Sequence, residues 1–224
     1  TLPPKGDLFD RSRMELGEIC EIVESDLLGR RRVDTDVSSI AGYLKNKRVM
    51  VTGAGGSIGS ELCRQLAIFD PEHLIMLDRD ESALHAVQLS IDGQAMLDSD
   101  NIVLGDIRDR GRMERIFAHH RPEVVFHAAA LKHLPLLERH PGEALLTNVQ
   151  ATVSLLDLSA RFGVDRFVNV SSDKAANPIS VLGYSKRLSE RLTAHYAEQA
   201  DGNFMSVRFG NVLGSRGSVL TSFH

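Results

Sequence analysis

The sequence predicts an α/β fold with a doubly wound parallel sheet. From Arg48 onward, short apolar runs rich in β-branched residues alternate with amphipathic stretches of ten or more residues. This alternation is typical of strands joined by crossover helices in a sheet that is buried on both faces. A glycine-rich turn between the first apolar run and the first amphipathic stretch indicates the same fold.

Each strand is expected where an apolar run meets turn residues, and each helix where apolar residues recur every three or four positions. The expected strands are RVMVTGA (48–54), HLIMLDRD (73–80), NIVLGDI (101–107), EVVFHAAA (123–130), RFVNVSS (166–172) and FMSVRFGNVLG (204–214). The expected helices are 57–69, 81–91, 111–120, a long helix over 141–163 that ends at a glycine, and 183–200.

The 224 residues suffice for one large domain with an addition. Residues 1–47 form a polar, charged lead-in, and residues 48–224 form the α/β domain. The lead-in contains three successive arginines, Arg30 to Arg32, after a glycine. They are equally consistent with a solvated turn and with a clamp for a phosphate group.

Composition excludes several classes of protein. The net charge of −4 carries no basic excess, so we expect no nucleic-acid partner. No apolar run reaches membrane-spanning length, and no signal peptide is recognisable. Cys20, Cys63 and the nine histidines lack the spacing of metal ligands, so we expect no metal site. We interpret the two cysteines as reduced thiols in a reducing compartment.

The turn VTGAGGSIGSEL predicts a dinucleotide site. It places Gly53, Gly56 and Gly59 between a strand and a helix, where backbone N–H groups approach a pyrophosphate. Ser57 and Ile58 begin that helix, and Asp78 ends the second strand. The Gly-x-x-Gly-x-x-Gly spacing resembles the extended short-chain dehydrogenase/reductases, which have a Rossmann-like fold.

The identity of the dinucleotide depends on the end of the second strand. The carboxylate of Asp78 would bind the ribose hydroxyls and repel a 2′-phosphate, which favours NAD, whereas the adjacent Arg79 leaves NADP possible. Asp106 and Ile107 resemble the adenine-contacting pair of the superfamily, with a strand-end cap as the alternative for the aspartate. Ala128 and Ala129 are small enough for a cofactor to cross the sheet edge there.

Four motifs narrow the resemblance. VTGAGGSIGSEL, HAAALKHLPLLERHPGEALLTNVQAT, VNVSSDKAANPISVLGYSKRLSE and VRFGNVLGSRGSV together resemble the CapD-like polysaccharide-biosynthesis family of nucleotide-sugar 4,6-dehydratases. The resemblance implies conversion of a UDP-N-acetylhexosamine, UDP-GlcNAc above all, to a 4-keto-6-deoxy sugar with tightly held NAD(P). It also implies a homo-oligomer on the cytoplasmic face of a membrane. Membrane helices would precede this stretch, and a substrate-binding region would continue beyond His224.

The superfamily's usual catalytic tyrosine is missing. It stands four residues before the lysine, and here that position is Leu182, before Lys186. Tyr184 lies about 200° round the helix from Lys186, so we expect it to be structural. Long members of the family also lack the tyrosine, so Leu182 does not imply an inactive enzyme.

The resemblance assigns the chemistry to the stretch SSDK instead. Lys174 would be the C5 base, Asp173 the C6 acid, and Ser172, or a water that it orders, would receive the C4 hydroxyl proton. These roles need a lowered pKa for Lys174 and a raised pKa for Asp173. Lys186 would bind the nicotinamide ribose. The alternative for the Asp173–Lys174 pair is an exposed turn with a weak surface ion pair.

Five further residues are weaker candidates. Lys132 would lie near the cofactor or the sugar, or in a solvated turn. Asn148 resembles a superfamily asparagine that stabilises the site helix, but a buried helix amide is equally consistent. The expected contacts with the nucleotide diphosphate are Asn211, Arg208 and Arg216, in a loop that is also consistent with an ordinary glycine-rich turn.

Two other functions remain open. A nucleotide-sugar epimerase would share the oxidation at C4, although the adjacent acid and base favour dehydration. A non-catalytic dinucleotide-binding module is the alternative from another class.

Overall fold

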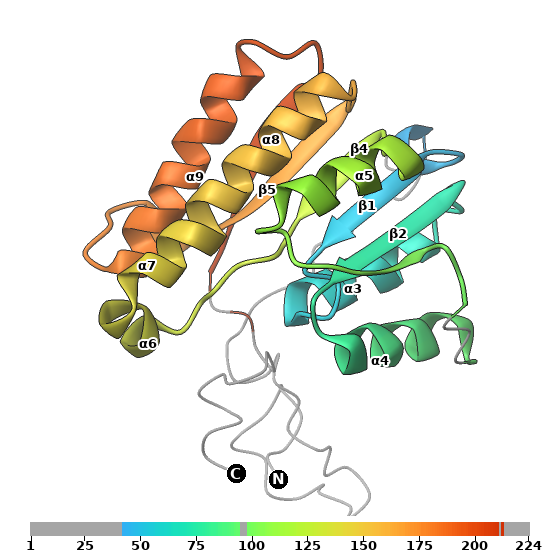
Figure 1. Ribbon diagram of the computed structural model, residues 1–224, viewed down its shortest axis with the longest axis horizontal. Helices are drawn as coiled ribbons and strands as arrows, with labels where there is room; N and C mark the ends of the chain where they lie inside the picture. Colours follow the sequence, from blue (N-terminus) through green and yellow to red (C-terminus); the bar gives the residue numbers. More distant parts are fainter. Residues whose placement is uncertain (1–41, 95–97, 211, 213–224) are drawn as a thin grey trace, which may run out of the picture. The chain divides into compact units, whose positions relative to one another are not determined.

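A computed structural model describes residues 42–94, 98–210 and 212. Its sheet has six strands, all parallel, in the order β3-β2-β1-β4-β5-β6, which confirms the predicted doubly wound fold (Figure 1). The strands are β1 (Arg48–Thr52), β2 (His73–Asp78), β3 (Ile102–Leu104), β4 (Val124–His127), β5 (Arg166–Ser172) and β6 (Asn203–Phe209).

Helices cover both faces of this sheet (Figure 1). The longer ones are α3 (Ser57–Ala67), α4 (Glu81–Asp92), α5 (Arg110–His120), α8 (Ala151–Arg161) and α9 (Val181–Ala197). Apolar side chains of α3 and α4 pack in one core cluster with one face of the sheet, and those of α5, α8 and α9 pack in a second cluster. Along β1, Val49 and Val51 belong to the first cluster and Met50 to the second, as expected for alternating strand residues.

The expected helix over 141–163 consists of three successive helical segments. It comprises α7 (Pro141–Ala144), a π-helical turn η1 (Leu145–Gln150) and α8. An additional short helix, α6 (Leu134–Arg139), precedes it. The predicted long helix is therefore present, but it contains a wide π-helical turn, which hydrophobic spacing does not reveal.

The described chain begins just before β1. Leu44 is buried in the core cluster with α3 and α4, and Lys47 pairs with Glu123 at 2.7 Å. The described residues all belong to one compact unit. The boundary placed between residues 47 and 48 stays a prediction. No helix in the described part of the chain is both long and apolar enough to span a bilayer.

Candidate dinucleotide and catalytic site

A cleft of about 140 Å³ opens at the carboxyl ends of β1, β2 and β4. Ligands bind at this edge in open parallel sheets, beside the point where the strand order reverses. Many of the residues named for the cofactor line this cleft, whereas Ser57, Ile58, Gly59, Lys132 and Lys186 do not, and their role as cofactor contacts stays a prediction. The cleft is lined by Gly53, Gly56, Leu77, Asp78, Arg79, Gly105, Asp106, Ile107, Ala128, Ala129, Ala130, Leu131 and Thr147.

Two glycines make the turn before α3 possible. Gly53 has φ 71°, a left-handed conformation, and a Cβ there would lie 2.6 Å from the backbone of Ala129. A Cβ on Gly59 would lie 2.0 Å from the carbonyl oxygen of Gly53. The loop, the first turn of α3 and the end of β4 therefore pack backbone against backbone, which leaves space for a ligand above them.

The first turn of α3 is suited to an anion. Asp80, Asp109 and Ser180 cap α4, α5 and α9 with their side chains, whereas α3 follows Gly56 without a side-chain cap. Its first turn also carries no acidic residue. A phosphate at this position would accept hydrogen bonds from backbone N–H groups at the start of α3.

Asp78 lies at the end of β2 beside the glycine turn. Its Oδ2 accepts a 2.8 Å hydrogen bond from the backbone N–H of Gly55, and its Oδ1 accepts one from Asp80. The carboxylate is thus fixed at the rim of the cleft, where ribose hydroxyls would meet it.

Asp106 is a shared partner of two arginines, Arg79 and Arg108. Arg108 donates to both carboxylate oxygens of Asp106, and Arg79 lies 3.9 Å from the same carboxylate. Hydrogen bonds from Arg108 lower the pKa of Asp106. Asp106 is thus paired mainly with Arg108, and its contact with the half-exposed Arg79 is a weaker one.

Thr147 was not anticipated as a cofactor contact. It is 7% exposed, lines the cleft, and its hydroxyl has no hydrogen-bond partner among the described residues. A buried hydroxyl without a partner costs free energy, so a ligand or water is its natural acceptor or donor. Thr147 lies in η1, and the direction of its side chain depends on a π-helical turn that the sequence pattern does not predict.

Asn148, the next residue of η1, connects the loop after β4 to α9. Its Oδ1 accepts from the backbone N–H of Leu131, and its Nδ2 donates to the carbonyl oxygen of Leu131 and to Ser185 Oγ. Both interpretations of this asparagine hold, because it is a buried helix amide that also fixes the cleft wall and the site helix.

His127 ends β4 below the cleft and is 1% exposed. Its ring nitrogens lie 2.7 Å from Thr52 Oγ1 and 2.9 Å from Thr152 Oγ1, on β1 and α8. Burial, followed by the charge of Lys186, lowers the pKa of His127 to about 3. A neutral histidine therefore ties together the elements that carry the glycine turn and η1.

Lys186 lies in the second turn of α9 and is buried. Its Nζ donates a 2.8 Å hydrogen bond to the carbonyl oxygen of Val170 on β5. Burial lowers the pKa of Lys186 to about 8, an effect that the carboxylate of Glu190 partly offsets. The ammonium thus lies against the strand that carries the predicted catalytic residues.

Ser172, Asp173 and Lys174 form one hydrogen-bonded group after β5. Ser172 Oγ donates to Asp173 Oδ1 at 2.9 Å, and Lys174 Nζ lies 3.1 Å from the same oxygen. Hydrogen bonds from Lys174 and Ser172 lower the pKa of Asp173. The pKa of Asp173 lies below its ordinary value because Asp173 is 54% exposed and paired, and the raised pKa expected beside substrate and cofactor stays a prediction.

Leu182 occupies the position of the missing tyrosine and is 4% exposed. It packs with Leu137 and Ala144 in a small apolar cluster. Tyr184 is 57% exposed on the same helix, consistent with the expected separation from Lys186. The ring of Tyr184 is therefore no replacement for a tyrosine at position 182.

The remaining candidates are less central. Lys132 is exposed and is not among the residues that line the cleft. Arg208 on β6 forms a bidentate pair with Glu190, at 2.7 Å for each hydrogen bond. Asn211 and Arg216 lie outside the described residues, as do Arg30 to Arg32 and Cys20.

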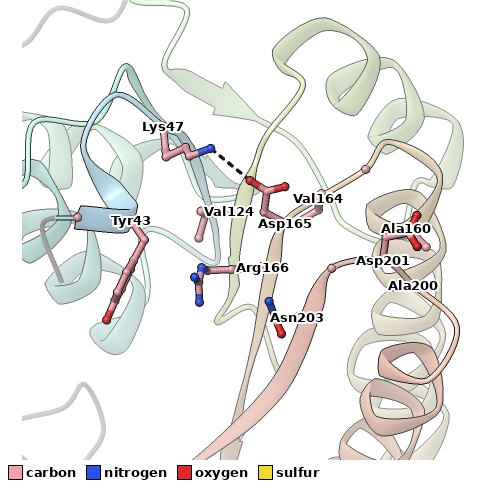
Figure 2. Close-up of a pocket in the computed structure, with 13 residues that line it drawn as sticks. Tyr43, Lys47, Val124, Ala160, Val164, Asp165, Arg166, Ala200, Asp201 and Asn203 are labelled. Atoms are coloured by element: carbon pink, nitrogen blue, oxygen red, sulfur yellow. Dashed lines mark hydrogen bonds and ion pairs between the residues drawn. The ribbon is translucent and has the colours of Figure 1, made fainter. Parts of the chain in front are cut away.

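A larger hollow of about 430 Å³ lies at the opposite edge, beside the amino-terminal ends of β4, β5 and β6. Figure 2 shows Lys47 pointing to Asp165, to which it is bonded at 3.2 Å, with Tyr43 and Arg166 nearby. The guanidinium of Arg166 lies 4.7 Å from the ring centroid of Tyr43. These charges and this ring interact with one another at the edge away from the glycine turn, so we place the functional site in the smaller cleft.

Comparison with known proteins identifies relatives of this chain. The profile of the polysaccharide biosynthesis protein family matches residues 49–224. The probable polysaccharide biosynthesis protein EpsC of Bacillus subtilis (strain 168) is 42% identical over 211 residues, which cover 92% of this chain and 35% of the relative. A UDP-N-acetylglucosamine 4,6-dehydratase (inverting) of Campylobacter jejuni is 32% identical over 181 residues, covering 79% of this chain and 52% of the relative.

Among solved structures, a UDP-glucose-4-epimerase from Stenotrophomonas maltophila with bound NAD and formylated UDP-arabinopyranose superposes with a TM-score of 0.63. It is 27% identical, and the match covers 72% of this chain and 52% of the epimerase chain. The chain therefore spans between about a third and a half of the proteins that it resembles.

Proposed function

Because this chain belongs to the polysaccharide biosynthesis protein family, we propose that it is an NAD-dependent 4,6-dehydratase of a UDP-N-acetylhexosamine, UDP-GlcNAc above all. One observation carries the proposal. The Ser172, Asp173 and Lys174 group lies at the carboxyl end of β5, on the sheet edge that also forms the dinucleotide cleft. Loss of water from a sugar needs both a base and an acid, and this group supplies both.

The residues of the cleft fit a dinucleotide. The uncapped first turn of α3 would bind the pyrophosphate, Asp78 the adenosine ribose, and Lys186 the nicotinamide ribose. Bound NAD⁺ would accept hydride from C4 and return it to C6, so the reaction needs no external redox partner. We infer NAD rather than NADP because the carboxylate of Asp78, held at the cleft by the Gly55 N–H, would repel a 2′-phosphate.

The protein's own groups would move the protons. Ser172, or a water that it orders, passes the C4 hydroxyl proton on to solvent as C4 becomes a ketone. Lys174 removes the acidified C5 proton, and Asp173 gives its proton to the C6 hydroxyl, which leaves as water. Lys174 then returns its proton to C5, and Asp173 regains one from solvent. Passing one proton from Lys174 to Asp173 across their hydrogen bond converts the observed ion pair into the amine and acid that these steps need.

Product analysis tests the proposal. The full-length protein incubated with NAD⁺ and UDP-GlcNAc should give a keto sugar that has lost one water. Lys174→Ala should abolish this product, whereas Lys45→Ala, which removes an exposed lysine at the opposite edge, should leave it unchanged. A hexose product that keeps its C6 hydroxyl would show an epimerase instead, and tight NAD binding without turnover would indicate a non-catalytic module.

The family resemblance extends the proposal to the cellular setting. We infer that the protein acts as a homo-oligomer on the cytoplasmic face of a membrane, with any membrane anchor outside the described residues. Light scattering of the purified full-length protein and protease accessibility in oriented membrane vesicles test the two statements separately.

A further inference from the structure

The carboxylate of Glu190 joins three elements beside the catalytic loop. Glu190 lies on α9, one helical turn after Lys186, and its side chain is 11% exposed. Its Oε1 accepts hydrogen bonds of 2.7 Å from Ser171 Oγ on β5 and from Arg208 Nε on β6. Its Oε2 accepts a third, also 2.7 Å, from Arg208 Nη2. We name these three residues, Glu190, Arg208 and Ser171, the Glu190 brace.

The end of β5 depends on such contacts because it loses one neighbouring strand. The pairing of β4 with β5 ends at Asn169, whereas the pairing of β5 with β6 continues to Ser172. Beyond Asn169, α9 supplies two contacts to β5, the Lys186 bond to the Val170 carbonyl and the Glu190 bond to Ser171. Ser171 immediately precedes the group Ser172, Asp173 and Lys174.

The charges in the brace complement one another. Hydrogen bonds from Arg208 are the main cause of the lowered pKa of Glu190. Arg187 Nη1 is a more distant partner at 3.5 Å. Removal of Arg208 would leave a largely buried carboxylate without its bidentate donor, which is the costly way to break such a pair.

We propose that Glu190 and Arg208 are positioning residues that hold the Ser172–Lys174 loop in its reacting geometry. This proposal rests on the dehydratase function proposed above. It assigns Arg208 a role through Glu190 and Ser171, in place of the contact with the nucleotide diphosphate that the sequence predicts. A small displacement of catalytic groups is enough to lower a rate by one to two orders of magnitude.

Hydrogen–deuterium exchange tests whether Glu190 and Arg208 hold the Ser172–Lys174 loop, and it does not require turnover. In the full-length protein, Glu190→Gln should accelerate amide exchange in peptides covering residues 170–176 by about tenfold, because local opening becomes easier. Arg208→Gln should have the same effect in the same peptides. The control Glu114→Gln breaks a comparable pair with Arg161 at the protein surface and should leave these peptides unchanged.

Steady-state kinetics test whether this positioning supports catalysis. Glu190→Gln and Arg208→Gln should each lower kcat by about tenfold or more while KM for the nucleotide sugar stays within about twofold. The double variant should be no worse than either single variant, since both break one unit. Glu190→Asp, which keeps the charge, should recover part of kcat.

The outcomes separate the proposals. Unchanged exchange in both variants overturns the brace. A rise in KM for Arg208→Gln alone shows a direct substrate contact and also overturns it. Thermal unfolding that is lowered without any change in kcat shows a merely structural role. If the wild-type protein dehydrates no UDP-N-acetylhexosamine, the proposed function fails, while accelerated exchange still supports the brace.

Discussion

Lys186 donates its hydrogen bond to the carbonyl oxygen of Val170 from a position that is only 8% exposed. One hydrogen bond does not replace the water that a free ammonium binds, so burial disfavours the charged form. The pKa of the lysine beside the predicted cofactor position is thus lowered to about 8, and its protonation is linked to folding.

The cofactor-free protein should therefore become more stable between pH 8 and pH 9. The pKa of Lys186 is about 8 in the fold, against 10.5 for an ordinary lysine. Between these values the unfolded chain binds more protons than the folded chain, so the free energy of unfolding rises with pH, by about 1 kcal/mol over this unit. Urea unfolding at pH 7, 8 and 9 measures the rise.

Lys186→Met is the control, because it removes the titrating group and should flatten this dependence. The interval stops at pH 9 because burial raises the pKa of Cys63 to about 12, against an ordinary value of 9.0. The unfolded thiol loses its proton first, so Cys63 offsets part of the rise as pH approaches 9 and lowers stability above it. An equal slope in the wild-type protein and the variant would refute the linkage.

Gly59→Ala should abolish dinucleotide binding. The added Cβ would lie 2.0 Å from the Gly53 carbonyl oxygen, so the turn before α3 must shift. Calorimetric titration with NAD⁺ should show no binding in a protein that remains folded. Gly142→Ala is the matched control, because the added Cβ would meet nothing within 4 Å. Loss of NAD⁺ binding in this control variant would contradict the argument.

Thr147→Val should weaken NAD⁺ binding by about five- to tenfold without loss of stability. Valine keeps the shape of threonine and removes a buried hydroxyl that has no partner in the described protein. The variant should therefore lose only the hydrogen bond to the ligand, which contributes about 1 kcal/mol to binding. Ser159→Ala removes another such hydroxyl, on α8 and away from the cleft, and should leave NAD⁺ affinity intact. Equal affinities for all three proteins would exclude Thr147 as a cofactor contact.

Leu182→Tyr should not restore a tyrosine-dependent activity. Leu182 packs against Leu137 and Ala144, so the larger ring overfills this cluster and lowers the free energy of unfolding by about 1–3 kcal/mol. Leu182→Met, of similar volume, should cost less. A rise in dehydratase turnover in Leu182→Tyr would contradict this expectation.

Local patterns explain what the sequence predicts well. The glycine turn, Asp78 and the SSDK stretch each occupy a strand end, and parallel strands bring their carboxyl ends to one edge, so their common location at that edge follows from the fold class. Long-range pairings are different. Glu190 and Arg208 are 18 residues apart on a helix and a strand, and only the folded sheet places them in contact.

The direction of single side chains was equally beyond prediction. Thr147 reaches the cleft because η1 is wider than an α-helical turn, and apolar spacing does not distinguish the two. The pKa of Asp173 was expected to rise through burial, but its exposed pairing with Lys174 lowers it. Burial and pairing are properties of the folded surface, and composition does not reveal them.

The π-helical turn also limits how this segment tolerates insertions and deletions. Each residue of an α-helix advances the side-chain direction by about 100°. A deletion within residues 145–150 would rotate α8 relative to the residues before it, so either Asn148 would lose Leu131 or Leu155 would leave the core. The segment therefore accepts substitutions more readily than changes of length, and an alignment gap placed inside it would equate residues with unrelated roles.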